Sequence, residues 1–133
     1  MAKKSIHTSG KRKRAIARAT LRPGNGIVTI NNTHINVYQP NMAKMRIQEP
    51  LILAKDAASK VNISVNVRGG GIASQADASR LAIAKALSEH DPSLRQAFLD
   101  YDRQLLVADV RRKESSKPNT HGQARAKRQK SYR

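Results

Sequence analysis

The sequence of 133 residues contains no cysteine, few aromatic residues and only nine acidic residues. The lack of cysteine excludes disulfides and thiolate zinc sites, and it suits a reducing compartment. No aliphatic run is longer than Leu51-Ile52-Leu53-Ala54, whereas a membrane-spanning helix needs about 20 apolar residues. The basic N-terminus has no apolar stretch behind it, so we expect no secretory signal and a cytoplasmic location.

Aromatic side chains are too few to form a stacking platform for single-stranded nucleic acid. Only Tyr38, Phe98, Tyr101 and Tyr132 are present. Proteins that grip single strands by base stacking use several aromatic residues in one groove. If this chain binds a nucleic acid, we expect it to do so through phosphates and shape.

Basic residues are abundant and lie mostly near the two ends of the chain. The sequence has 26 Lys and Arg, which gives a net charge of +17. Residues 1–22 carry +8, residues 23–110 carry +1 and residues 111–133 carry +8. A nearly neutral body between two basic ends is typical of a protein that clamps a nucleic acid. An enzyme that acts on an acidic small molecule would instead be expected to concentrate positive charge in a cleft of the body.

This distribution predicts one folded domain with two extended arms. We expect a basic N-terminal arm over residues 1–13, a globular domain over 14–110 and an extended basic tail over 111–133. Five of the last nine residues are basic and none is acidic, so this segment has no apolar face to bury and should be ordered only by an anionic partner. RNA is the partner that this composition favours.

An alternating pattern starts at Arg14 and predicts a strand with two different faces. Small or apolar residues (Ala15, Ala17, Ala19 and Leu21) form the inner face. Arg14, Arg18 and Arg22 fall on the outer face, although like charges on one strand face repel each other. Together with Lys11-Arg12-Lys13 they predict a surface covered by a polyanion.

The remaining pattern predicts an α+β fold, a two-layer sandwich with helices on one face of a sheet. We expect strands at 26–30, 33–37, 61–67 and 105–110. We expect helices at 42–48, 51–59 and 72–89, and a further helix from an N-cap at Asp91 to about residue 102. Buried side chains are predicted at Met42, Met45, Leu51, Leu53, Ile72, Ala76, Ile83, Leu87, Leu94, Ala97, Phe98 and Tyr101.

Gly69-Gly70-Gly71 lies between a predicted strand and a predicted helix. Backbone amides at a helix start favour an RNA phosphate or a nucleotide, but this turn lacks the Lys-Ser/Thr of a nucleotide-triphosphate loop. A tight turn that needs positive φ explains the glycines equally well. The turn, with or without an RNA phosphate, is favoured over a nucleotide site.

The ionisable side chains of the body show no catalytic or metal-binding pattern. The carboxylates are scattered over the predicted helices and their ends, and the four histidines are too dispersed for metal ligation. We therefore expect no enzymatic activity, no metal, no cofactor and no small-molecule substrate. Arg68, Arg80 and Arg103 are isolated in the sequence and are compatible with either RNA contact or a surface role.

Three motifs in order give the chain a resemblance to small-subunit ribosomal protein nine. The first runs from Gly10 through Ala19 to the Leu21–Gly26 turn, and the second comprises Gly69-Gly70-Gly71 with Gln75, Arg80 and Ala82-Ile83-Ala84. The third spans residues 109–112, Lys117-Pro118 and the end Gln129-Lys130-Ser131-Tyr132-Arg133. The Lys-Ser-Tyr-Arg ending resembles the archaeal and eukaryotic branch. The resemblance covers nearly the whole chain.

The resemblance implies a left-handed βαβ crossover, as in the second domain of small-subunit ribosomal protein five. It implies a place in the head of the small ribosomal subunit, with ribosomal RNA, neighbouring head proteins and peptidyl-site tRNA as partners. Lys130 and Arg133 would contact the tRNA. The expected RNA-binding residues are Lys11, Arg12, Lys13, Arg14, Arg18, Arg22, Gly69, Gly70, Gly71, Arg111, Arg112, Arg125, Lys127 and Arg128.

Two alternative hypotheses of function are based on the same features. A free DNA-compacting protein would also need two basic arms, because phosphate contacts carry no sequence information. A small kinase-like enzyme is the weakest alternative, because the nucleotide-loop lysine and a carboxylate cluster are both missing.

Overall fold

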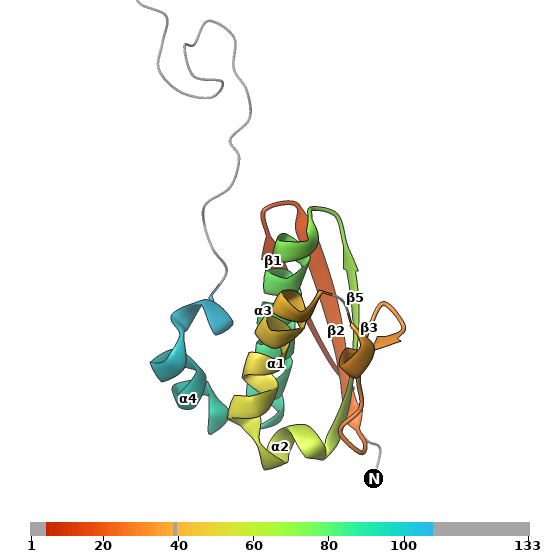
Figure 1. Cartoon of the computed structure of the whole chain (residues 1–133). Coiled ribbons are helices and arrows are strands. Elements are labelled where there is room, and N and C mark those ends of the chain that lie inside the picture. Colours follow the sequence, from red (N-terminus) through yellow and green to blue (C-terminus); the bar gives the residue numbers. More distant parts are fainter. Residues whose placement is uncertain (1–4, 39, 108–133) are drawn as a thin grey trace, which may run out of the picture.

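The computed structural model describes residues 5–38 and 40–107, which form one mixed sheet with helices on one side (Figure 1). The sheet has the strand order β1-β2-β5-β3-β4. Its strands are β1 (Ile6–Arg12), β2 (Ala15–Pro23), β3 (Val28–Ile30), β4 (Thr33–His34) and β5 (Val61–Arg68). The helices are η1 (Ile35–Val37), α1 (Asn41–Ala54), α2 (Asp56–Ser59), α3 (Ile72–His90), α4 (Leu94–Tyr101) and η2 (Arg103–Leu105).

Strands β2 and β5 form the centre of the sheet and confirm the two clearest strand predictions. They pair antiparallel from Ile16 opposite Arg68 to Pro23 opposite Val61. Every second residue of each strand is buried, because alternate side chains of a strand point to opposite faces. The small inner face of β2 lets helix α3 lie close to the sheet.

Strand β1 was not predicted, and the expected N-terminal arm is wrong for residues 6–12. Its seven residues pair with β2 from Ile6 opposite Leu21 to Arg12 opposite Ala15. Gly10 is buried beneath α3, and a Cβ there would lie 2.4 Å from the Ala78 carbonyl oxygen. The Thr8 hydroxyl donates to the Ala82 carbonyl at 2.7 Å. The strand is held by a helix some 70 residues away in sequence, which a local pattern does not reveal.

Helix α1 runs through Pro50, where the sequence predicted a break between two helices. A proline inside a helix removes one hydrogen bond and costs about 3 kcal/mol. The helix continues because Ala43, Ile47, Pro50 and Ala54 form one buried stripe at helical spacing. Met42 and Met45, which were predicted to be core residues, lie outside this stripe and are 72% and 63% exposed.

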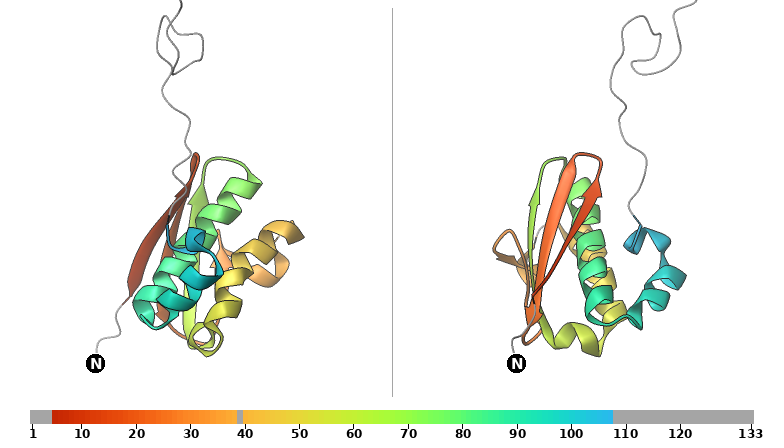
Figure 2. Two further views of the ribbon diagram at one scale, coloured as in Figure 1. Left: turned by 90° about the vertical axis from the view of Figure 1, so that its left-hand side faces the viewer. Right: turned by 180° about the vertical axis from the view of Figure 1, so that it is seen from behind.

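Helix α3 crosses the sheet and supplies most of the second layer. Ala76, Ile83 and Leu87 are buried as predicted, whereas Ile72 in its first turn is 59% exposed. Figure 2 shows α1 beside α3 and α4 farther from the sheet, all on the same side. None of the helices in the described ranges is long and apolar enough to cross a membrane.

The segment after α3 differs from the prediction in two places. Asp91 ends α3, and its Oδ1 accepts hydrogen bonds from the Ser93 amide and hydroxyl, which lower the pKa of Asp91. Ser93 is the N-cap of α4, and of the predicted buried stripe only Phe98 is fully buried, while Ala97 and Tyr101 are exposed. The predicted strand 105–110 is wrong at Leu105, which ends η2. Residues 108–110 lie outside the described part.

The topology places α1 in the connection between two parallel strands. Strand β3 pairs parallel to β5, and the chain between them passes through β4, η1, α1 and α2. The predicted third strand at 33–37 is reduced to the two residues of β4, followed by η1. The observed architecture is therefore α+β, with a mixed sheet covered by helices on one face.

Candidate nucleic-acid interface

The sheet face opposite the helices, here called the open face, carries polar and basic side chains with Ile16 as its one apolar member. It comprises His7, Ser9 and Lys11 of β1, Ile16, Arg18, Thr20 and Arg22 of β2, Asn62, Ser64, Asn66 and Arg68 of β5, Thr29 of β3 and His34 of β4. Residues directly opposite in a ladder point to the same face. The alternation predicted for β2 therefore extends across the whole sheet.

Strand pairing arranges the open face in cross-strand rows. Lys11, Ile16 and Arg68 form one row, and Ser9, Arg18 and Asn66 form the next. Three cationic side chains (Lys11, Arg18 and Arg68) are thus gathered within two neighbouring rows. For Arg68 the sequence was compatible with either RNA contact or a surface role. It lies in the same two rows as Lys11 and Arg18, which were predicted to bind RNA.

Acidic residues are kept away from this face. All seven acidic residues in the described ranges lie on helices or next to helix ends, namely Glu49, Asp56, Asp77, Glu89, Asp91, Asp100 and Asp102. The strands of the same ranges carry none. The molecule therefore has a cationic sheet layer and a helix layer of mixed charge, which favours a polyanion on the open face.

The turn between β1 and β2 meets the glycine turn at one end of the sheet. Gly69 and Gly70 have φ of +78° and +67°, and a Cβ on Gly69 would lie 2.6 Å from the Arg14 carbonyl oxygen. Positive φ favours glycine at both positions, and the close approach of the Arg14 backbone is a second reason at Gly69. Lys13 and Arg14 in the facing turn are exposed. The amide side chain of Gln75 donates to the Gly69 carbonyl at 3.2 Å.

Gly71 has a different role from its two neighbours. It is the N-cap of α3, its φ is −107°, and nothing lies within 4 Å of an added Cβ. The backbone around Gly69 and Gly70 is thus a tight turn packed against the β1–β2 hairpin at Arg14 and Ala15. This arrangement fits the predicted tight turn, and an RNA phosphate bound there stays a prediction.

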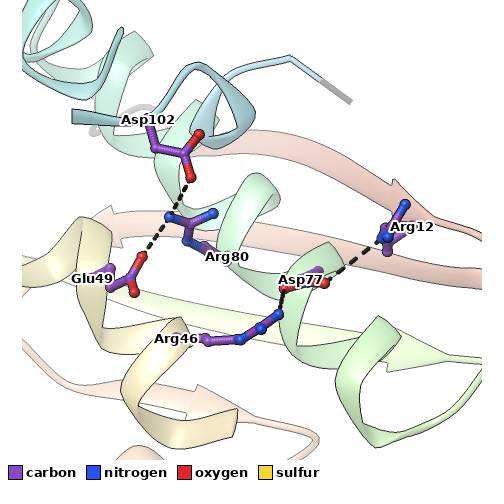
Figure 3. A network of polar contacts seen from close by, with 6 residues as sticks. All are labelled: Arg12, Arg46, Glu49, Asp77, Arg80 and Asp102. Atoms are coloured by element: carbon purple, nitrogen blue, oxygen red, sulfur yellow. Dashed lines mark hydrogen bonds and ion pairs between the residues drawn. The ribbon is translucent and has the colours of Figure 1, made fainter. Parts of the chain in front are cut away.

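Arg12 lies on the helix side of the sheet, away from the open face. Its Nε is 3.7 Å from Oδ2 of Asp77 on α3. Arg46 of α1 binds the other oxygen of Asp77 at 2.8 Å (Figure 3). Asp77 therefore joins β1 to the helix layer. In the sequence Arg12 was grouped with its neighbour Lys11 as an RNA contact. Adjacent residues of a strand face opposite sides of the sheet, so Arg12 points toward the helices while Lys11 lies on the open face.

Arg80 is also an internal residue. Its guanidinium contacts Glu49 of α1 and lies 3.1 Å from Oδ2 of Asp102, at the end of α4 (Figure 3). Arg103 is exposed on η2. The predicted contacts at Arg111, Arg112, Arg125, Lys127, Arg128, Lys130 and Arg133 lie outside the described residues.

Comparison with known proteins identifies a family over nearly the whole chain. The family model described as Ribosomal protein S9/S16 matches residues 10–133. The chain belongs to this family. The sequence-based resemblance is thereby confirmed.

Curated relatives of similar length are named Small ribosomal subunit protein uS9. The chain is 48% identical to the protein from Methanococcus maripaludis strain C7 over 133 residues, which covers 98% of this chain and 99% of the relative. It is 50% identical to the protein from Thermoplasma acidophilum over 128 residues, covering 95% and 98%. Identity to the Methanothrix thermoacetophila protein is 48%, with 98% and 99% covered. Membership of this family does not support the alternative hypothesis that the chain is a free DNA-compacting protein.

Proposed function

We propose that the protein is a structural constituent of the small ribosomal subunit and that its open face binds ribosomal RNA. The observation that carries the proposal is the open face itself, with Lys11, Arg18, Arg22 and Arg68 on strands that carry no acidic residue within the described ranges. Family membership supports the ribosomal setting. No catalytic step is part of this proposal.

The proposed RNA contacts extend from the open face to the adjoining turns. Lys13 and Arg14 with the Gly69-Gly70-Gly71 turn would hold one stretch of phosphate backbone at the end of the sheet. Arg12 is left out of the proposed RNA contacts because it forms an ion pair with Asp77. Exposed Met42, Met45 and Ile52 on α1 are suited to a protein neighbour in the subunit head rather than to RNA.

The proposal also includes the finer points that the resemblance implies. The crossover from β3 through α1 to β5 would be left-handed. Residues 111–133 would run through ribosomal RNA by way of Arg111, Arg112, Arg125, Lys127 and Arg128, and Lys130 and Arg133 would reach peptidyl-site tRNA. The location would be the cytoplasmic ribosome.

The salt dependence of RNA binding tests the role of the open face. We expect the variant Arg18→Ala/Arg22→Ala/Arg68→Ala to bind the small-subunit RNA more weakly. The slope of log affinity against log salt should become flatter by about two to three units, since each phosphate contact contributes about 0.7–0.9. Affinity is measured by filter binding at several salt concentrations.

A charge-matched variant provides the control. Lys60, Arg95 and Arg103 are exposed basic residues on or beside the helices, and replacing all three by Ala also removes three positive charges. This control should leave the slope nearly unchanged. Equal effects of the two variants would mean that net charge, and not the open face, binds RNA.

A further inference from the structure

Arg80 is a nearly buried cation that joins three separate segments of the helix layer. Its side chain is 13% exposed and projects from α3. It contacts Glu49 of α1, 31 residues away in sequence, and Asp102, 22 residues away, with a distance of 3.1 Å to Oδ2. One guanidinium thus holds two carboxylates that would otherwise repel each other (Figure 3).

The energetics of this triad favour a positioning role over a contribution to net stability. Only the guanidinium is mostly buried, since the side chains of Glu49 and Asp102 are 32% and 38% exposed. Ion pairs that are partly open to water give little net stabilisation, and the buried partner loses hydration. Here the cost is not fully offset, since Nε of Arg80 is buried without a hydrogen-bond partner in the described part. What such a triad does provide is a single relative position of the segments that carry its members.

Asp102 connects this triad to the end of the folded body. It is the C-cap of α4, where its amide donates to the Phe98 carbonyl at 2.9 Å. Its own carbonyl accepts from the Leu105 amide in η2 at 3.0 Å. The described chain ends at Val107, only five residues after Asp102. We call the segment from Asp102 to Val107 the exit corner.

We infer that Arg80 is a positioning residue that fixes the exit corner, and hence the point on the body from which the C-terminal tail begins its path to RNA. The part of this inference that concerns the tail rests on the proposed function, whereas the part that concerns the exit corner does not. The exit corner is also held by the buried Leu105 side chain and by the backbone hydrogen bonds of η2, whereas the contact with Arg80 ties it to α3 and α1.

The first experiment uses the free full-length protein and needs no ribosome. Amide hydrogen exchange is compared between the original chain and the Arg80→Met variant, which keeps an unbranched apolar side chain. The amides of Asp102 and Leu105 should exchange about tenfold faster or more in the variant, since the exit corner then loses its ion pair with α3. Amides of β2 and β5 should change much less. An unchanged exit corner would overturn the inference.

Arg95→Met is the matched control. Arg95 is exposed on α4, so the substitution removes the same charge and leaves the triad intact. It should leave the exchange of Asp102 and Leu105 unchanged. Equal acceleration in both variants would assign the effect to lost charge on the helix layer and would also overturn the inference.

The second experiment follows the tail in assembled subunits. Because the chain has no cysteine, Ser116→Cys in the tail or Ser59→Cys on the body gives a single attachment site for an iron chelate that cleaves nearby RNA. Adding Arg80→Met should leave the cleavage pattern from position 59 unchanged. Cleavage from position 116 should move or weaken at least about threefold, as expected when the tail starts from several positions.

A third variant separates positioning from stability. Glu49→Gln/Arg80→Met/Asp102→Asn removes all three charges of the triad, so the two carboxylates no longer repel each other and thermal stability should exceed that of Arg80→Met alone. The cleavage pattern from position 116 should stay altered, because the ion pair between α3 and the exit corner is still absent. Recovery of the original pattern would overturn the positioning role. Absence of RNA cleavage from both sites in the otherwise original chain would contradict the proposed function, while the exchange experiment would still decide the role of Arg80.

Discussion

Gly10 occupies the closest approach between β1 and α3. A Cβ at this position would lie 2.4 Å from the Ala78 carbonyl oxygen and 2.8 Å from the Ala82 amide nitrogen. Both neighbours are helix backbone atoms, which cannot move aside as a flexible side chain can. The absence of a side chain at Gly10 is therefore a packing requirement and not a need for unusual φ.

We predict that Gly10→Ala destabilises the protein by about 1–3 kcal/mol or more, because overpacking forces backbone shifts. The measurement is urea unfolding followed by circular dichroism. Gly71→Ala is the control, since an added Cβ there meets nothing within 4 Å and φ is ordinary. A Gly10→Ala protein as stable as the original would show that β1 does not pack against α3.

Strand β1 shows how a polar segment can form part of a fold. Ile6 is its only aliphatic residue, so the alternation that marked β2 and β5 is missing. Its contacts come from the ladder with β2, the Thr8 hydrogen bond to Ala82, and the bond from Lys85 Nζ to the Ser9 carbonyl at 3.1 Å. At the edge of the sheet it also places Lys11 on the open face.

Limited proteolysis of the free protein tests this element. We expect trypsin to cut after Lys3 or Lys4 and within residues 111–133, and to leave the bond after Lys11 intact. Ladder hydrogen bonds protect a strand from cleavage, whereas the basic tail lacks apolar residues to bury. Mass spectrometry of the resistant core gives its ends. A core that begins at Arg12 or Lys13 would show that β1 separates from the sheet without RNA.

At the scale of the whole molecule, residues 5–38 and 40–107 separate their charges between a sheet layer and a helix layer. Internal ion pairs use acidic residues of the helix layer, as in Asp77 with Arg12 and Arg46, whereas the cations of the open face remain exposed. The proposed tail would add a longer reach, because residues 117–133 in an extended conformation would span about 55 Å, at about 3.3 Å per residue. The body and the end of the tail would then contact different partners.

We predict that deleting residues 129–133 leaves the protein incorporated into small subunits but weakens peptidyl-site tRNA binding. The loss should be about 1–3 kcal/mol, as expected for two charge-assisted contacts. Those residues carry two of the basic side chains, Lys130 and Arg133, so most RNA contacts remain. Filter binding of tRNA to purified subunits, with the protein quantified in them, gives both results.

Point variants refine the same experiment. Lys130→Ala/Arg133→Ala should reproduce most of the loss, and Gln129→Ala/Ser131→Ala should not. Full incorporation together with unchanged tRNA affinity in the deletion would leave the tail with a purely architectural role.

Local patterns in the sequence were enough to predict the features that depend on near neighbours along the chain. Alternating side chains defined β2 and β5, helical spacing defined most of α3, and the charge distribution pointed to a polyanion. These patterns are readable because each residue's face follows from the period of its own element. Three motifs in order were enough to indicate the family.

Features that depend on partners distant in sequence became visible only in the folded chain. Residues 6–12 form a strand because they pack against α3, and helix α1 continues through Pro50 because it has a buried stripe. Pairing with β2 places Arg68 on the open face. Arg12 forms an ion pair with Asp77, and Arg80 forms ion pairs with two carboxylates distant in sequence. A basic residue looks the same in sequence whether it faces solvent or an acidic partner, because only the fold sets which charges meet.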